Sequence, residues 1–256
     1  MLYSSWYWTE QVSWSPNIGL VSHAMICTVL RMESITAQLI PLATGIVISP
    51  IPLVAVIAIL LSVRSKANAF AYTASITVAA AVITAVTAYT TTGVAAKASG
   101  GAHTVQTAFA VVFTIGFLAL AYSSWRARPK GDAEPAMPSW LAQIDSMQPL
   151  KAAVLGLLLT VPNAKNLPLE LKAGSIIGGD HLSWIGILAY SVLFAVAASI
   201  ALIILSTLAA VPSERVTDAL RSTKTALIRH NSAIMTVLFL MLAALELSHV
   251  VEALSK

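Results

Sequence analysis

The sequence predicts an all-α polytopic membrane protein whose six transmembrane helices form two inverted three-helix repeats. Three observations predict this fold. Hydrophobic residues make up 57% of the 256 residues and charged residues only 10%, less than half of the ~25% that soluble domains carry. Apolar segments that reach the ~20 residues needed to cross a bilayer recur between short basic connections. Two of these segments are interrupted by proline at similar places.

The membrane domain is expected to begin at Met32, so that residues 1–31 stand outside it and residues 32–256 form it. The first segment holds three tryptophans but no apolar periodicity, and its first basic residue is Arg31, which excludes an ordinary secretory signal. We expect a loose tail, or translation that begins at Met32; an aromatic anchor at the membrane interface is the alternative. The single cysteine, Cys27, excludes an internal disulfide.

The expected spans are residues 36–63, 69–91, 105–124, 151–177, 183–210 and 228–251. The first contains Ser49-Pro50-Ile51-Pro52, and because each proline removes an N–H and clashes with the preceding turn, the helix must break there. We expect the Ser49 hydroxyl to satisfy one of the freed carbonyls. The second span is rich in Ala and Thr, which is typical of a buried packing helix.

Residues 126–150 form the longest polar connection, expected in the cytoplasm. Pro138 and Ser139 can start a short helix there. Its apolar residues share one face, which is typical of a helix lying in the membrane interface; a helix covering the bundle is the alternative. These residues are Trp140, Leu141, Ile144 and Met147.

Charge placement predicts the orientation. Ten of the fifteen basic residues lie after the first, third and fifth spans. Between the fifth and sixth spans they occupy an expected loop that holds Arg215, Arg221, Lys224 and Arg229. By the positive-inside rule these connections are cytoplasmic, and both termini face outward from the plasma membrane.

Spans one and four carry similar breaks. Residues 45–50 read Gly, three aliphatic residues, Ser and Pro, and residues 156–162 read Gly, three aliphatic residues, Thr, Val and Pro. The two spans cross in opposite directions, so the halves are expected to be inverted repeats. Paired broken helices in such repeats form the substrate site of a transporter.

Lys165 lies inside span four, where an ammonium group costs at least ~2.5–3.5 kcal/mol unless it faces a cavity or an acidic partner. Glu170 follows it by about 140° of a straight helix, so a direct pair would need a break at Pro168 or another arrangement of the chain. A role in neutralising Glu170 is the structural alternative. The candidate substrate-binding residues are Ser49, Pro50, Pro52, Pro162, Asn163, Lys165, Asn166 and Glu170.

Other chemistry is not indicated. Glu246, His249 and Glu252 share a helix face near the outer end of the last span, where a metal site is conceivable but a solvated face is the preferred interpretation. No nucleophile–base set, phosphate loop, nucleotide motif or zinc spacing occurs. We therefore expect no enzyme activity, no catalytic residue, no metal and no cofactor. A net charge of +4 is too small to indicate nucleic acid.

Several motifs together resemble a known family. They are Leu-Ile-Pro-Leu-Ala-Thr-Gly at 39–45, Ser-Pro-Ile-Pro at 49–52, Arg-Ser-Lys-Ala-Asn-Ala at 64–69, Pro-Ser-Trp-Leu at 138–141, Asp-Ser-Met at 145–147 and Lys-Asn-Leu at 165–167. In them the chain, from Met32 onward, resembles the glycolipid-addressing proteins of actinobacteria, of the peptidoglycolipid- or sulfolipid-addressing type, within the lysine exporter superfamily. Relatives tend to have Asn-Pro-Lys-Asn in span four, whereas this chain has its proline at 162 and Ala164 before the lysine.

The resemblance implies export, or assistance in export, of glycolipids or lipid-linked cell-envelope components across the plasma membrane. Its implied partners are the bilayer, a glycolipid substrate and a larger lipid transporter. Two alternatives remain open, namely a small-solute exporter of the amino-acid type and a non-transporting accessory subunit. The sequence names neither the substrate nor the energy source, and it leaves a homo-oligomer open.

Overall fold

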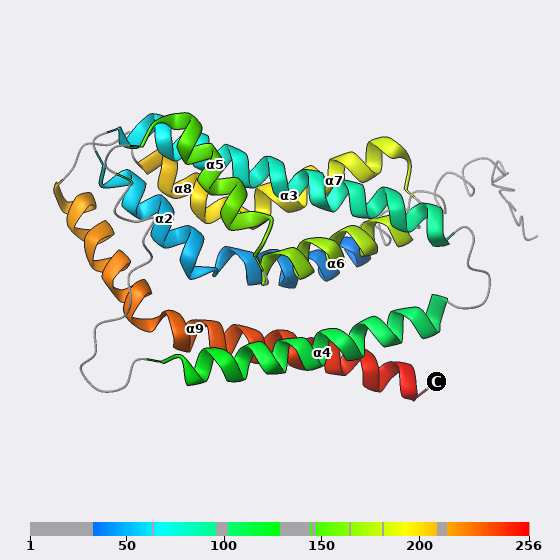
Figure 1. Ribbon diagram of the computed structural model, residues 1–256. Coiled ribbons are helices and arrows are strands. Elements are labelled where there is room, and N and C mark those ends of the chain that lie inside the picture. The colour runs from blue at the N-terminus through cyan, green and yellow to red at the C-terminus, as the bar shows by residue number, and fades with distance from the viewer. Residues whose placement is uncertain are drawn as a thin grey trace, which may run out of the picture.

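The structure is a computed structural model that describes residues 33–62, 64–95, 102–128, 144, 147–163, 165–180, 182–208 and 214–255. Every extended regular element in these ranges is an α-helix (Figure 1). The predicted tail at 1–31 lies outside the described residues. So does most of the predicted interfacial helix, although its Ile144 and Met147 are described and are buried against α2, α3 and α5.

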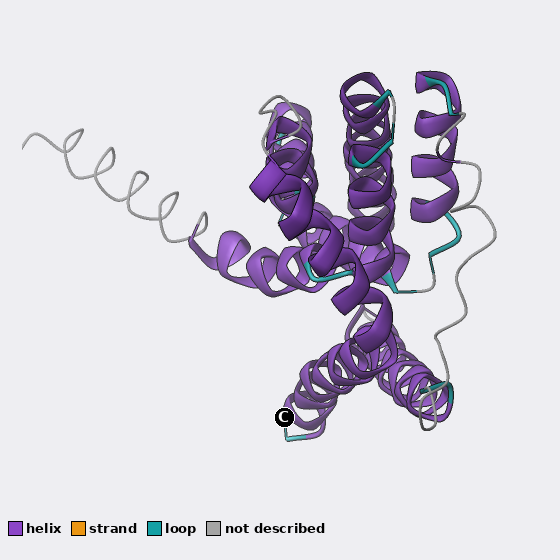
Figure 2. Cartoon of the chain, turned by 90° about the vertical axis from the view of Figure 1, so that its left-hand side faces the viewer, coloured by secondary structure: helices purple, strands orange, loops and turns teal. Residues whose placement is uncertain are grey.

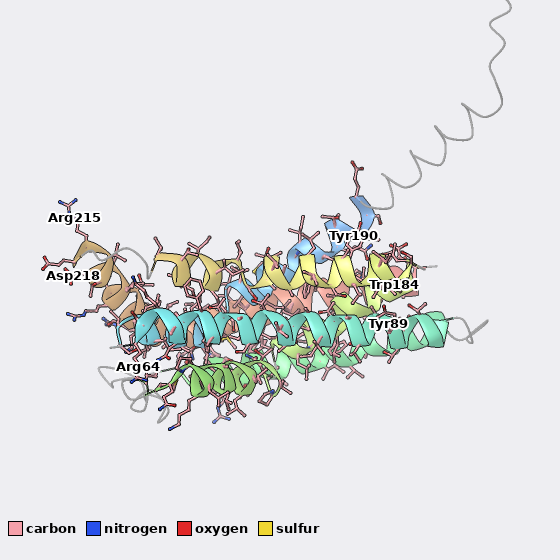
Figure 3. The ribbon with its side chains drawn as sticks, turned by 90° about the horizontal axis from the view of Figure 1, so that it is seen from above. Arg64, Tyr89, Trp184, Tyr190, Arg215 and Asp218 are labelled. Atoms are coloured by element: carbon pink, nitrogen blue, oxygen red, sulfur yellow. The ribbon has the colours of Figure 1, made fainter. Side chains whose placement is uncertain are left out.

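In chain order the described helices are Glu33–Val47, α2 (Pro50–Leu60), α3 (Ser65–Ala95), α4 (Ala102–Arg126), α5 (Pro149–Thr160), α6 (Asn166–Gly179), α7 (Trp184–Ala198), α8 (Ile200–Leu208) and α9 (Glu214–Leu254). In Figure 1 the chain reverses direction after α2, α3, α4, α6 and α8. Figure 3 shows Arg64 and Arg215 at one end and Tyr89 and Trp184 at the other. The basic connections therefore share one end of the bundle.

The protein is a membrane protein with two to four candidate spans in its described part. Ser65–Thr92 and Glu214–Ala253 are each long and apolar enough to cross a bilayer. Two bent pairs also qualify when each is taken as one span: Glu33–Val47 with α2, bent by 54°, and α7 with α8, bent by 57°. Ala110–Arg126 and α5 are shorter apolar helices. The six spans and the inverted repeat remain predictions.

The bend between α7 and α8 occurs without proline, and the sequence did not indicate it. Ser199 ends α7 with φ −98° and ψ 4°, and its N–H is shared between the carbonyls of Ala195 and Val196. The bend directs α8 back onto α3, where the hydroxyls of Ser206 and Thr73 lie 2.7 Å apart. A contact between distant segments therefore accompanies this break.

Glycines let α3 lie close to both α5 and α6. A Cβ added at Gly156 of α5 would be 2.9 Å from the Tyr72 carbonyl oxygen. In α6, a Cβ at Gly174 would lie 2.6 Å from the Thr84 carbonyl oxygen, and one at Gly178 would lie 2.3 Å from that of Ala88. Such approaches exclude any side chain, and they are the packing mode expected of small residues between membrane helices. As its composition predicted, α3 is the central packing helix.

Helices α4 and α9 pair along their length and cross beneath the other helices in Figure 2. Phe117 of α4 stacks on Phe239 of α9 with ring centroids 6.2 Å apart. Helix α9 is continuous from Glu214, so the expected basic loop between the last two spans is wrong: Arg215, Arg221, Lys224 and Arg229 lie on the helix. Helix α9 continues because its Leu220 and Leu227 pack on the α2–α3–α5 cluster.

The glycine contacts lead to a matched pair of variants. Gly178→Ala forces a methyl group into the Ala88 carbonyl and should lower the free energy of unfolding by about 1–3 kcal/mol, the usual cost of overpacking. Gly179→Ala is the control, because nothing lies within 4 Å of a Cβ there. Thermal unfolding in detergent compares the two, and equal stability would contradict the close α3–α6 contact.

Candidate functional site

The first helical break lies between Val47 and Pro50. Ser49 is extended, with φ −67° and ψ 114°, as residues before proline prefer. Its N–H donates to the Ile46 carbonyl at 2.9 Å. That carbonyl would bond residue 50 in a continuous helix, so the backbone of Ser49 replaces the donor that Pro50 lacks. The expected hydroxyl bond is wrong, because the Ser49 side chain makes no capping hydrogen bond although it is buried.

Pro50 and Pro52 are both buried in the first turn of α2. A proline tolerates this position because its missing N–H would be unsatisfied there anyway. The hydroxyl of Tyr72, which is fully buried on α3, donates to the Pro52 carbonyl at 3.2 Å. The prolines thus shape the backbone and its contact with α3, and they offer no polar group themselves.

The second break separates α5 from α6 and is held by Asn163. Its Oδ1 accepts from the N–H groups of Lys165 at 3.1 Å and Asn166 at 3.2 Å, and its Nδ2 donates to the Leu159 carbonyl at 3.0 Å. These are the bonds of a helix cap. Both polar groups of the Asn163 side chain are therefore used by the backbone, which differs from their predicted use in binding a substrate.

The two prolines around this break have different positions. Pro162 is exposed on the outside of the bundle, so it does not line the buried site. Pro168 lies in the first turn of α6, where a backbone N–H would have no partner within the helix. The helix breaks between Thr160, the last residue of α5, and Asn166, the first residue of α6, around Pro162 as the sequence predicted.

Three predicted site residues are buried together at the start of α6. Lys165 and Glu170 are each 1% exposed and Asn166 is 3% exposed. Within the described part of the chain, Lys165 Nζ, Asn166 Oδ1 and Glu170 Oε2 have no hydrogen-bond partner. Lys165 and Glu170 form no ion pair with each other. The structure therefore does not support neutralisation of Glu170 as the role of Lys165.

The first helix packs on α6 beside these residues. A Cβ added at Gly45 would lie 3.2 Å from Leu169 Cδ1 and 3.8 Å from Leu242 Cδ2 of α9. Leu169 precedes Glu170 directly, and Gly45 lies four residues before Ser49. The first helix and α6 thus meet next to the two breaks, and α9 completes the contact.

The acidic face of α9 was expected to be solvated, and the structure shows this for only part of it. Glu246 is 5% exposed and forms an ion pair with Lys172 of α6, so it is not solvated. His249 and Glu252 are exposed. In the ranges that the structure describes, no group of three His, Cys, Asp or Glu side chains could hold a metal ion.

Two further buried hydroxyls were missed by sequence reasoning. Thr84 of α3 is 0% exposed and Ser191 of α7 is 1% exposed, and neither hydroxyl has a partner within the described residues. Single Thr and Ser residues are common in apolar helices, where they usually bond to their own backbone. Only the three-dimensional arrangement distinguishes these two.

The family model described as Sap, sulfolipid-1-addressing protein, matches residues 39–251. The chain belongs to this family. No curated protein and no solved structure matches it. All eight candidate residues of this Sap-family chain lie within the matched range, so family membership covers both breaks. Membership implies a glycolipid-related role in the membrane, namely the addressing of a sulfolipid.

The α6–α9 ion pair gives a prediction on stability. Lys172→Met leaves the Glu246 carboxylate buried without its partner and should cost about 2 kcal/mol, below the 3–5 kcal/mol of fully buried pairs because the Lys172 side chain is 23% exposed. The double variant Lys172→Met/Glu246→Leu should recover most of this loss. Lys66→Met, at an exposed position, is the control. Thermal unfolding in detergent measures the effect, and a Lys172→Met protein as stable as the control would contradict it.

Proposed function

We propose that this Sap-family protein exports, or assists in exporting, an anionic glycolipid or lipid-linked envelope component across the plasma membrane. The observation that carries the proposal is Lys165, whose fully buried amino group has no hydrogen-bond partner among the described residues and lies at the break between α5 and α6. A charged lysine inside a membrane costs at least ~2.5–3.5 kcal/mol, and a lysine at such a position is typically retained for function. The role proposed for this protein is that of a transporter and not of an enzyme.

The chemistry of the break suits an anionic or polyhydroxyl headgroup. Lys165 would form charge-assisted hydrogen bonds with a sulfate or phosphate oxygen, which are strong in a low-dielectric site. The side-chain amide of Asn166 would form hydrogen bonds with the sugar hydroxyls. Ser49, Pro50 and Pro52 would form the facing wall, since the first helix packs on α6 at Gly45 and Leu169.

The position of the second break favours a lipid-linked substrate over a small solute. Val161 is 51% exposed on the outer surface of the helices, whereas Lys165, four residues later, is 1% exposed. The break therefore runs from the lipid-facing surface to the buried polar site. A glycolipid could place its headgroup at Lys165 while its acyl chains stay in the bilayer. A small-solute exporter needs no such lateral route.

Two further features belong to this proposal. The six spans would form inverted three-helix halves, with spans one and four paired, as in the lysine exporter superfamily. A second copy of the chain or a larger lipid transporter would be its protein partner. An accessory role would leave export unchanged when the polar site is neutralised, which separates it from transport.

Lys165→Met tests the proposal. Methionine is similar in length and removes a buried charge, so folding should be retained or slightly improved. Export of the glycolipid should fall by roughly 10- to 100-fold, because a hydrogen bond to a charged group contributes about 1.5–3 kcal/mol. Surface glycolipid in cells and thermal stability in detergent are measured together.

Lys151→Met is the matched control, since Lys151 is an exposed lysine at the start of α5. If Lys165 only neutralised Glu170, Lys165→Met would destabilise the protein, and the added Glu170→Gln change would restore both stability and export. A stable Lys165→Met protein that exports like the control would rule out the substrate site.

The orientation is tested by fusing a reporter that is active only in the cytoplasm. It should be active after Arg128 and after Arg221, in the basic end of the bundle, and silent after Asp180 and at the C-terminus. The reverse pattern would overturn the orientation and the direction of the proposed export.

A further inference from the structure

Helix α9 is longer than a bilayer is thick. It has 41 residues, which is about 61 Å at 1.5 Å per residue, whereas the hydrocarbon core of a bilayer is ~30 Å thick. Its mostly apolar part, from Ser232 to Leu254, is about 34 Å long. In Figure 1 the orange first part of α9 runs at an angle to the rest. The length of the apolar part therefore puts Ser232 near the edge of the hydrocarbon.

Helix α4 ends at the same level. The hydroxyl of Ser232 donates to the carbonyl of Ala127 at 3.4 Å, directly after α4 ends at Arg126. One turn before this end, Tyr122 and Trp125 are 63% and 52% exposed. Tyrosine and tryptophan side chains concentrate where a membrane meets water. The two aromatic residues and the length of α9 thus indicate the same boundary.

Three arginines surround the contact between Ser232 and Ala127. Arg126 and Arg128 are the chain neighbours of Ala127, and Arg229 lies three residues before Ser232. Position 229 is about one turn along α9 from position 232 and about 60° around it, so Arg229 lies beside the side of α9 that meets α4. All three arginines are exposed. They come from two helices to one place at the boundary.

Aromatic rings hold two of these side chains. The guanidinium carbon of Arg126 is 5.8 Å from the ring centroid of Tyr122, and that of Arg128 is 3.7 Å from the ring centroid of Trp125. Cation–π attraction orients a guanidinium over a ring and leaves its N–H groups free to donate. Among the described residues, no side chain forms an ion pair or hydrogen bond with the guanidinium group of Arg126, Arg128 or Arg229. These groups therefore present charge and unused donors.

The exposed face of α9 provides room next to Arg229. An open hollow of about 540 Å³ lies along this face, and Arg221, Arg229 and His230 are among its lining residues. Asp218 also lines it, but Asp218 is about 16 Å from Arg229 along the helix. Figure 3 shows Asp218 at the far tip of α9. The part of the hollow at Arg229 therefore favours an anion.

On the membrane side of the aromatic rings, α4 exposes an apolar stripe. Ile115 and Leu118 are 63% and 48% exposed. They lie seven and four residues before Tyr122, which places them on its side of the helix. From Ile115 to Arg126 this side of α4 changes from aliphatic to aromatic to cationic. A phospholipid has the matching order of acyl chain, glycerol and phosphate, so the stripe fits a lipid molecule.

We propose that Arg126, Arg128 and Arg229 bind the headgroup phosphate of an anionic phospholipid in the leaflet at the basic end of the bundle. The acyl chains of this lipid lie along Ile115 and Leu118. Guanidinium groups donate charge-assisted, bidentate hydrogen bonds to phosphate oxygens, and basic sites between membrane helices recognise such headgroups. The occupant is a lipid of the surrounding bilayer, because the three arginines are exposed where phospholipid is abundant. This inference goes beyond the proposed export and does not depend on it.

Native mass spectrometry of the purified full-length protein measures the affinity of the first bound lipid molecule. The probes are dioctanoyl phosphatidylglycerol and its zwitterionic match, dioctanoyl phosphatidylcholine, whose quaternary ammonium group the arginines repel. We expect the anionic probe to bind roughly tenfold more tightly or better, since a hydrogen bond to a charged group contributes about 1.5–3 kcal/mol. Equal affinities for the two probes would overturn the proposal.

Two double variants separate a site from a general attraction to the basic end. Arg126→Gln/Arg229→Gln should weaken binding of the anionic probe by roughly tenfold or more. Arg64→Gln/Arg215→Gln is the control, because it removes the same charge from two exposed positions at the same end (Figure 3) and should keep the preference. Thermal unfolding without added lipid should be the same in both variants, since all four arginines are exposed. Equal weakening in the two variants would overturn the site.

Competition identifies the source of the phosphate. Inorganic phosphate should not displace the anionic probe, because it has no acyl chains to lie along α4; displacement would show a site for free anions and overturn the proposal. A short-chain sulfated galactosyl lipid should bind more weakly than the anionic probe, because its sulfate lies beyond a sugar and farther from the boundary. Tighter binding of the sulfated lipid that is lost in Arg126→Gln/Arg229→Gln would assign the site to a glycolipid and overturn the choice of a bilayer phospholipid.

Discussion

The close contact of α3 with both α5 and α6 is the interaction on which the rest of the structure depends. Where a helix breaks, its two halves lose the hydrogen bonds that would align them, and inside a membrane neighbouring protein must supply the missing order. Gly156 before the break and Gly174 and Gly178 after it all lie against the α3 backbone. Helix α3 therefore packs against the helices on both sides of the break between α5 and α6.

This packing against α3 also determines which polar groups are buried. The face of α6 that carries Gly174 and Gly178 toward α3 is the same face that carries Asn166 and Glu170. The glycines cannot approach α3 unless these polar side chains enter the interior as well. Lys165, directly before α6, is buried as well. Its backbone N–H and that of Asn166 donate to the Asn163 side chain, which fixes the chain at the start of α6. The close packing of the glycines and the burial of Asn166 and Glu170 therefore both result from the same rotation of α6 about its axis. The close packing alone does not require an ionisable residue on that face.

The sequence predicted features that depend on local chemistry. Both breaks were expected because proline cannot continue a helix, and the small residues of α3 predicted close packing. Features that depend on distant contacts were missed: the bend at Ser199 accompanies a contact between Ser206 and Thr73, and Glu246 is buried because Lys172 reaches it from α6. Asn163 was assigned to a ligand although an asparagine three residues before Asn166 is also a capping signal.

The central claim, a polar site open to a headgroup in the apolar interior, is tested most directly by cysteine labelling in cells. In a Cys27→Ser background, Ser49→Cys, which keeps Lys165, should react with a small anionic water-soluble thiosulfonate, and added sulfated glycolipid should slow the reaction. Ile177→Cys, at a fully buried apolar position of α6, should not react. If the cysteine at position 49 is as unreactive as the one at 177, or if the glycolipid does not slow its labelling, the account is wrong.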